Sequence, residues 1–92
     1  MSFYLKDPQA RVDYAIDWAV YLDGQTIAAS SWFVMPEEAG GVAVEEASFE
    51  PARTAARLAG GVTGHAYAVA NQVTLSDGST DVRSLTLRVE AR

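Results

Sequence analysis

Apolar and polar residues alternate in the segment of residues 12–18. Val12, Tyr14, Ile16 and Trp18 fall on one side, and aspartates occupy two of the positions between them. Alternation of this kind predicts a half-buried β-strand. A single amphipathic strand buries nothing until a second layer packs on it. The later segments are therefore expected to supply further strands that cover this face.

A helix over residues 8–22 is the alternative for the same segment. Asp7 followed by Pro8 resembles an N-cap and a first helical position, and Gly24 stands where a helix can end. The even spacing of the β-branched and aromatic residues favours the strand. A short helical turn at residues 19–22 is expected to follow it.

Further strands are predicted along the rest of the chain, separated by turns that contain glycine or proline. Their expected ranges are residues 26–35, 42–49, 53–59, 65–76 and 80–89. The pair Glu45 and Glu46 interrupts the alternation of one of them, which predicts a β-bulge. Asp77 and Gly78 predict a tight hairpin between the last two strands.

Six or seven short strands in a chain of 92 residues predict an all-β fold. The spacing of the turns is typical of an immunoglobulin-like antiparallel β-sandwich of six to seven strands. Tyr67, near the start of the penultimate strand, is placed to return its hydroxyl to a nearby backbone group while its ring stays in the core, as in the tyrosine corner of such sandwiches.

The expected domain organisation is a single immunoglobulin-like domain over residues 12–92, preceded by an N-terminal arm of residues 1–11. The apolar residues of the arm come before the break at Lys6, Asp7 and Pro8. Two roles are open for the arm. It forms an edge strand of this domain, or it docks on a neighbouring subunit.

The charge of the chain limits its partners. A net charge of −5 and scattered basic residues disfavour binding to the phosphates of nucleic acid. No apolar run reaches the about 18–20 residues that a membrane helix needs, so no membrane partner is expected. The absence of cysteine from the sequence excludes disulfides and thiolate sites.

The candidates for chemistry are few, and each has a simpler explanation. The lone histidine, His65, lacks a motif that would supply a nucleophile, and a zinc site needs more ligands. We therefore predict no catalytic residue, no cofactor and no metal site. Several carboxylates in the middle of the chain resemble oxygen ligands for calcium, but a solvated acidic face explains them better. They are Glu37, Glu38, Glu45, Glu46 and Glu50. The indoles of Trp18 and Trp32 are expected in the core and not on sugar rings.

Several motifs in order resemble a known family. They are Phe-Tyr-Leu-Lys-Asp-Pro at residues 3–8, Asp-Tyr-Ala-Ile-Asp-Trp at residues 13–18, Thr-Ile-Ala-Ala-Ser-Ser-Trp at residues 26–32, and Arg-Ser-Leu-Thr-Leu-Arg-Val at residues 83–89. Together they resemble the phage fibre-tail adaptor family of small tailed-phage and prophage proteins. The resemblance implies an immunoglobulin-like virion structural protein, without catalytic residues, that fits between tail or neck proteins and fibres.

The resulting hypothesis is a non-enzymatic adaptor, present in several copies in the phage particle, that binds other virion proteins after assembly in the bacterial host cytoplasm. Unpaired strand edges suit such repeated contacts. Phe3, Tyr4, Leu5 and Phe33 are the expected partner contacts. The alternative is an immunoglobulin-like carbohydrate- or calcium-binding module of a surface protein.

Overall fold

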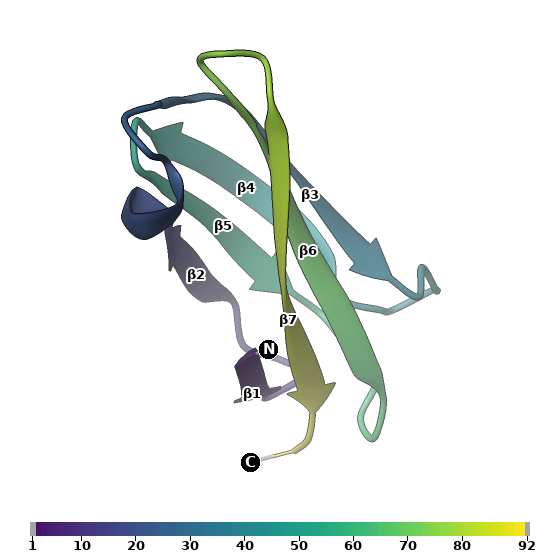
Figure 1. Cartoon of the computed structure of the whole chain (residues 1–92). Coiled ribbons are helices and arrows are strands. Elements are labelled where there is room, and N and C mark those ends of the chain that lie inside the picture. Colours follow the sequence, from purple (N-terminus) through teal and green to yellow (C-terminus); the bar gives the residue numbers. More distant parts are fainter. Residues whose placement is uncertain (1, 92) are drawn as a thin grey trace.

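The computed structural model of the chain describes residues 2–91, and side chains from residue 4 onward. Strands dominate the fold, and one short 3-10 helix interrupts them (Figure 1). The elements are β1 (Ser2–Lys6), β2 (Val12–Asp17), η1 (Ala19–Tyr21), β3 (Ile27–Met35), β4 (Ala43–Glu50), β5 (Arg53–Ala59), β6 (Ala66–Leu75) and β7 (Thr80–Val89). The prediction of an all-β fold is confirmed.

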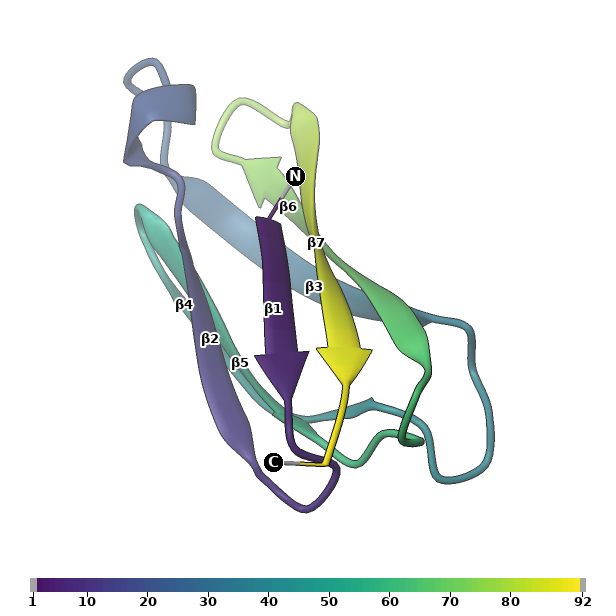
Figure 2. The same cartoon turned by 90° about the horizontal axis from the view of Figure 1, so that it is seen from below.

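The strands form two sheets that pack face to face. One sheet has the order β2-β5-β4 and the other has the order β1-β7-β6-β3. Figure 2 shows the two sheets on either side of the core, with β2, β4 and β5 in one layer and β1 and β7 in the other. β2, β5 and β4 correspond to strands B, E and D of an immunoglobulin domain, and β3, β6 and β7 correspond to strands C, F and G. The predicted immunoglobulin-like sandwich is confirmed.

The first strand departs from purely antiparallel pairing. β1 runs parallel to β7, from Ser2 opposite Leu85 to Lys6 opposite Val89, and forms an edge of the four-stranded sheet. Lys6 is buried, and its ammonium group donates to the carbonyl oxygens of Asp7 at 2.9 Å and Gly60 at 2.7 Å. Residues 2–6 therefore form an edge strand of this domain, and the docking of this segment on a neighbouring subunit stays a prediction.

The segment of residues 8–22 does not form the alternative helix. Residues 12–17 are strand β2, which pairs antiparallel with β5, and residues 19–21 form the short helical turn that the sequence predicted. Trp18 lies between the two elements, one residue beyond the strand, and its side chain is fully buried. Trp18 therefore extends the inward-facing series of β2 into the core, although it lies just beyond the end of the strand.

The last two strands follow their predicted parity. β6 and β7 pair as an antiparallel hairpin, and the inward residues of both strands are buried. These residues are Tyr67, Val69, Asn71, Val73, Leu75, Leu85, Leu87 and Val89. In β5 the predicted inward residues Thr54, Ala56 and Leu58 are also buried. Together these residues supply most of the core between the sheets.

Two strands contain irregularities. The register of β4 against β5 shifts between Val44 and Glu46, which confirms the predicted bulge. The register of β3 against β6 shifts between Ile27 and Ala29, which the alternation did not indicate. Because of this second shift Ile27 is buried, although the alternation groups it with Phe33, whose side chain is exposed.

A polar network links the two sheets inside the core. The indole Nε1 of Trp18 donates to Thr54 Oγ1 and Asn71 Oδ1, both at 3.1 Å. Thr54 also donates to Asn71 at 2.7 Å, and the Asn71 amide donates to Ser30 Oγ and to the Ser31 carbonyl at 2.9 Å. Buried polar groups stabilise a fold only when their hydrogen bonds are satisfied. The Asn71 side chain forms hydrogen bonds with several of these polar groups at once.

Candidate interaction sites

The predicted partner contacts lie on the four-stranded sheet. Tyr4 and Leu5 are on β1 and Phe33 is on β3, so the sheet order β1-β7-β6-β3 places them at opposite edges. Phe3 belongs to β1, but its side chain lies outside the described residues. The fold therefore does not gather the predicted contacts into one compact site.

Among the members whose side chains are described, Leu5 and Phe33 are the most exposed, and Tyr4 is 42% exposed. Leu5 is 48% exposed and Phe33 is 52% exposed. The ring of Tyr4 instead packs edge-on against Tyr14 of the facing sheet, with a centroid distance of 5.3 Å. Part of the Tyr4 side chain is therefore exposed to solvent, and part packs between the sheets. Leu5, the next residue along the strand, faces the opposite side of the sheet.

Met35 is an exposed apolar residue that was not among the predicted contacts. It is 64% exposed and lies two residues beyond Phe33, on the same face of β3. The signal was present in the sequence, because positions 31, 33 and 35 share a parity. The two side chains form an exposed apolar pair, Phe33 and Met35, at the end of an edge strand.

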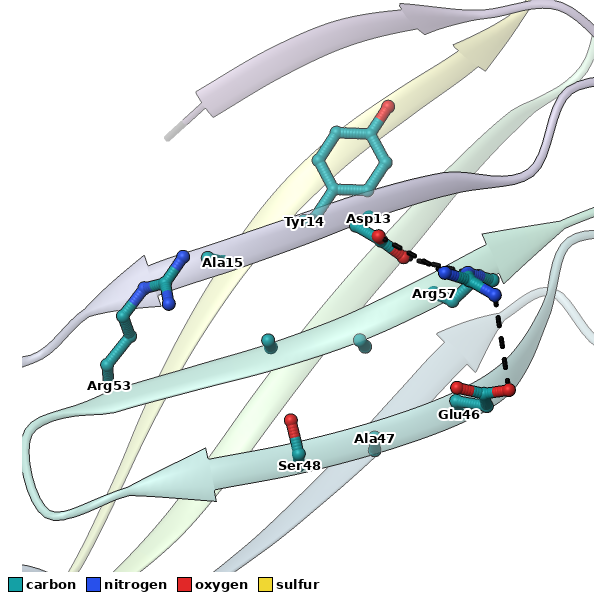
Figure 3. Close-up of a pocket in the computed structure, with 10 residues that line it drawn as sticks. Asp13, Tyr14, Ala15, Glu46, Ala47, Ser48, Arg53 and Arg57 are labelled. Atoms are coloured by element: carbon teal, nitrogen blue, oxygen red, sulfur yellow. Dashed lines mark hydrogen bonds and ion pairs between the residues drawn. The ribbon is translucent and has the colours of Figure 1, made fainter.

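A shallow depression of about 330 Å³ lies on the outer face of the three-stranded sheet (Figure 3). Its floor is made of small side chains in cross-strand register, with Ala15 opposite Ala55 and Ala55 opposite Ser48. Figure 3 shows Arg57 at one end of this row and Arg53 at the other. The alternation of β5 produces this spacing, because residues 53, 55 and 57 face the same side.

The two arginines differ in their partners. Arg57 pairs with Asp13 at 2.9 Å and approaches Glu46 at 4.0 Å. The carboxylates raise the pKa of Arg57, and its hydrogen bond lowers the pKa of Asp13. Arg53 has no ion pair among the residues whose side chains are described. The depression has no histidine among its described lining residues.

His65 is the lone histidine of the sequence and lies just before β6. Its ring is about half exposed, and its Nδ1 lies 3.0 Å from Glu38 Oε2. The same carboxylate oxygen accepts a hydrogen bond from the Tyr67 hydroxyl. Within the described part of the chain, the ring therefore meets a carboxylate and not a hydroxyl nucleophile. The contact joins the loop after β3 to the start of β6.

Tyr67 confirms the predicted tyrosine corner. Its ring is buried, and its hydroxyl accepts a hydrogen bond from the backbone N–H of Val62 at 3.0 Å. Burial and the bond to Glu38 raise the pKa of Tyr67, while hydrogen bonds from Tyr67 and His65 lower the pKa of Glu38. The sequence indicated the corner but not Glu38, because the contact joins residues 29 positions apart.

The other candidates for ligand binding are dispersed or buried. Glu45 pairs with Arg11 at 3.0 Å, so this carboxylate and Glu38 have separate partners. In residues 4–91 no group of three or more histidines or carboxylates is arranged to hold a metal ion. The Trp18 ring is fully buried and presents no face to a sugar. Across the described chain, no helix has the length and apolar character to span a membrane.

The chain matches a protein-family model. Residues 6–88 match the sequence model of a family described as podophage GP4 fiber-tail adaptor protein gp77. The matched region extends from the last residue of β1 to the penultimate residue of β7, so it includes both sheets. No curated protein matches the chain.

Proposed function

The chain belongs to the podophage GP4 fiber-tail adaptor family of gp77, and from this premise we propose that it is a non-enzymatic structural protein of a phage virion. In this role it joins the tail or neck to fibre proteins through protein–protein contacts. The observation that carries the proposal is the family match over residues 6–88, which spans nearly the whole sandwich.

The surface chemistry of the sandwich supports a role in assembly. Large apolar side chains are exposed at both edges of the four-stranded sheet, on β1 and on β3. Exposed apolar groups favour contact with another protein, because their burial at an interface removes apolar surface from water. We infer that Phe3, Tyr4, Leu5 and Phe33 contact partner proteins in the particle.

The absence of a catalytic role is also part of the proposal. His65 and Glu38 contact each other, and Tyr67 ties the same carboxylate to the fold. A hydrogen-bonded trio of this kind has a structural use at a tyrosine corner. The chain is therefore proposed to act by binding alone, in several copies, on other virion proteins. Its net charge of −5 disfavours nucleic acid as a partner.

The place of action follows from the same role. The protein is assembled into the particle in the bacterial host cytoplasm and remains in the virion. Disruption of its gene in the phage or prophage tests this directly. We expect particles that keep capsid and tail but lose most of their fibres, and mass spectrometry of wild-type particles detects this chain. Particles that carry a full set of fibres without the chain would show that it is not the adaptor.

A further inference from the structure

The sandwich has four edge strands, and three of them are protected against pairing with another strand. Edge strands expose unpaired backbone groups, and proteins commonly block them with charges, bulges or short length. β1 has five residues, β2 carries Asp13 and Asp17, and β4 carries a bulge at its two adjacent glutamates. These three edges are therefore poor templates for a further strand.

β3 is the exception. Among the described strands it pairs with β6 alone, and it has nine residues from Ile27 to Met35 with neither a charged residue nor a proline. It lies at the right-hand side of the molecule in Figure 1. Beyond its register shift, residues 29–35 pair regularly with β6, so this length of β3 has the regular geometry that an added strand needs.

The exposed side chains of β3 favour an apolar neighbour. Phe33 and Met35 point outward, away from the core, and each has more than half of its surface exposed. A strand added beside β3 would place every second side chain next to them, because side chains alternate across a sheet. Cross-strand apolar pairs on this face would then contribute to binding together with the backbone hydrogen bonds.

The charges around β3 select the kind of strand. Residues 23–38, which contain β3, include three acidic residues and no lysine, arginine or histidine. Asp23 precedes β3 and Glu37 follows it, and neither has an ion-pair partner among the residues whose side chains are described. A partner strand with basic residues at both ends would complement these carboxylates.

A second copy of the chain fits this edge poorly. Antiparallel pairing of two β3 strands would bring Glu37 of each copy towards the Asp23 end of the other. Parallel pairing would set equivalent carboxylates beside each other. Either arrangement places like charges together at an interface, which opposes association.

We propose that the open edge of β3 binds an extended segment of another virion protein, apolar and uncharged at its centre and basic at its ends, as an added β-strand over residues 29–35. This proposal rests on the adaptor function proposed above and names the edge and the partner chemistry. It predicts that β3, and not β4, is the strand that joins the two proteins.

A cross-linking experiment tests the proposal in the assembled particle. The chain contains no cysteine, so Ser31→Cys and Ser48→Cys each introduce a single site for a thiol-reactive benzophenone label. Both serines are exposed and lie on edge strands, Ser31 on β3 and Ser48 on β4, which makes Ser48→Cys a matched control. Labelled protein is added to particles assembled without it, illuminated, and the cross-linked peptides are identified by mass spectrometry.

The expected result is a cross-link from position 31 to a tail, neck or fibre protein, within a segment of the predicted charge pattern. The label at position 48 should not reach that segment. A cross-link from position 31 to a second copy, to a segment with acidic ends, or to no protein while the chain is present in the particle would overturn the inference alone. Failure of unlabelled wild-type protein to enter particles would refute both the inference and the adaptor function.

A charge placed on the edge gives an independent readout. Ser31→Lys puts a cation beside the incoming strand, so it should reduce the number of chains per particle by about tenfold at limiting protein. Ser48→Lys should leave that number unchanged. Thermal unfolding of both variants checks that the sandwich is intact. Equal incorporation of the two folded variants would contradict the use of β3.

Discussion

The polar core depends on Asn71, whose side-chain amide is buried. It accepts hydrogen bonds from Trp18 and Thr54 and donates to two groups of β3, so it connects both sheets in a chain without disulfides. The sequence showed that Asn71 has inward parity but not what it contacts. Hydrogen bonds between residues 17 to 53 positions apart depend on the packing of the sheets and leave no local signal.

The two tryptophans offer a matched comparison of this network. Trp18 Nε1 has two acceptors, whereas Trp32 Nε1 is buried and has no hydrogen-bond partner in the described part of the chain. We expect Trp18→Phe to lower the free energy of unfolding by about 2–3 kcal/mol, through lost hydrogen bonds and lost packing. Trp32→Phe removes a donor that makes no bond and should cost about 1 kcal/mol or less.

Urea denaturation of the two variants measures the difference. A larger loss for Trp32→Phe than for Trp18→Phe would mean that the network around Asn71 contributes little to stability.

Glu38 gives the fold a dependence on acidic pH. Hydrogen bonds from Tyr67 and His65 lower the pKa of Glu38 below its ordinary value. The unfolded chain therefore takes up a proton at this carboxyl at a higher pH than the folded chain does, so this contribution to stability is lost as the pH falls through the folded pKa. We expect the urea midpoint of wild type to fall more steeply than that of Glu38→Gln between about pH 6 and about pH 3.

The control for this experiment is Glu37→Gln, at the neighbouring exposed carboxylate, which should follow the wild-type profile. Parallel profiles for wild type and Glu38→Gln would show that the contact does not contribute to folding.

At the scale of the elements, local patterns predicted most of the strands and several of their details. The bulge at residues 45–46, the turn after β2 and the hairpin at residues 77–78 were confirmed because each has its own short signal. The parallel pairing of β1 with β7 and the register shift of β3 were not predicted. Both depend on which strand lies alongside, and alternation carries no information about the neighbour.

The anchoring of β1 depends on Lys6, which the sequence placed at a break in the chain. Burial lowers the pKa of Lys6, and the charge of Asp7 opposes this effect only in part. The unfolded chain therefore binds more protons than the folded chain at alkaline pH, so the contribution of this group to stability rises with pH towards its ordinary pKa. Lys6→Met keeps the apolar stem and removes the ionisable group.

We expect the urea midpoint of wild type, relative to that of Lys6→Met, to increase between about pH 8 and about pH 10. The comparison cancels the titration of Tyr67, because both proteins contain it. A relative midpoint that stays constant or decreases over this range would contradict the burial of a charged Lys6.

At the scale of the whole molecule, the pattern of turns and strands was sufficient for the two-sheet sandwich, because seven amphipathic strands in 92 residues have few other ways to bury their apolar faces. The function could not be reached from that pattern. The chain carries no catalytic motif, and the adaptor role came from the order of short motifs that resemble a family. Recognising β3 as the edge strand without a protective feature required the sheet order, which no local sequence pattern provides.

The central claim is that the chain joins phage tail or neck to fibre. The most direct measurement is a cryo-electron microscopy reconstruction of the fibre attachment region of the particle. We predict density for the sandwich between the two, in contact with a tail or neck protein on one side and a fibre protein on the other. A reconstruction in which the fibre binds the tail or neck directly, with the sandwich absent from the junction or touching only one of them, would contradict the account.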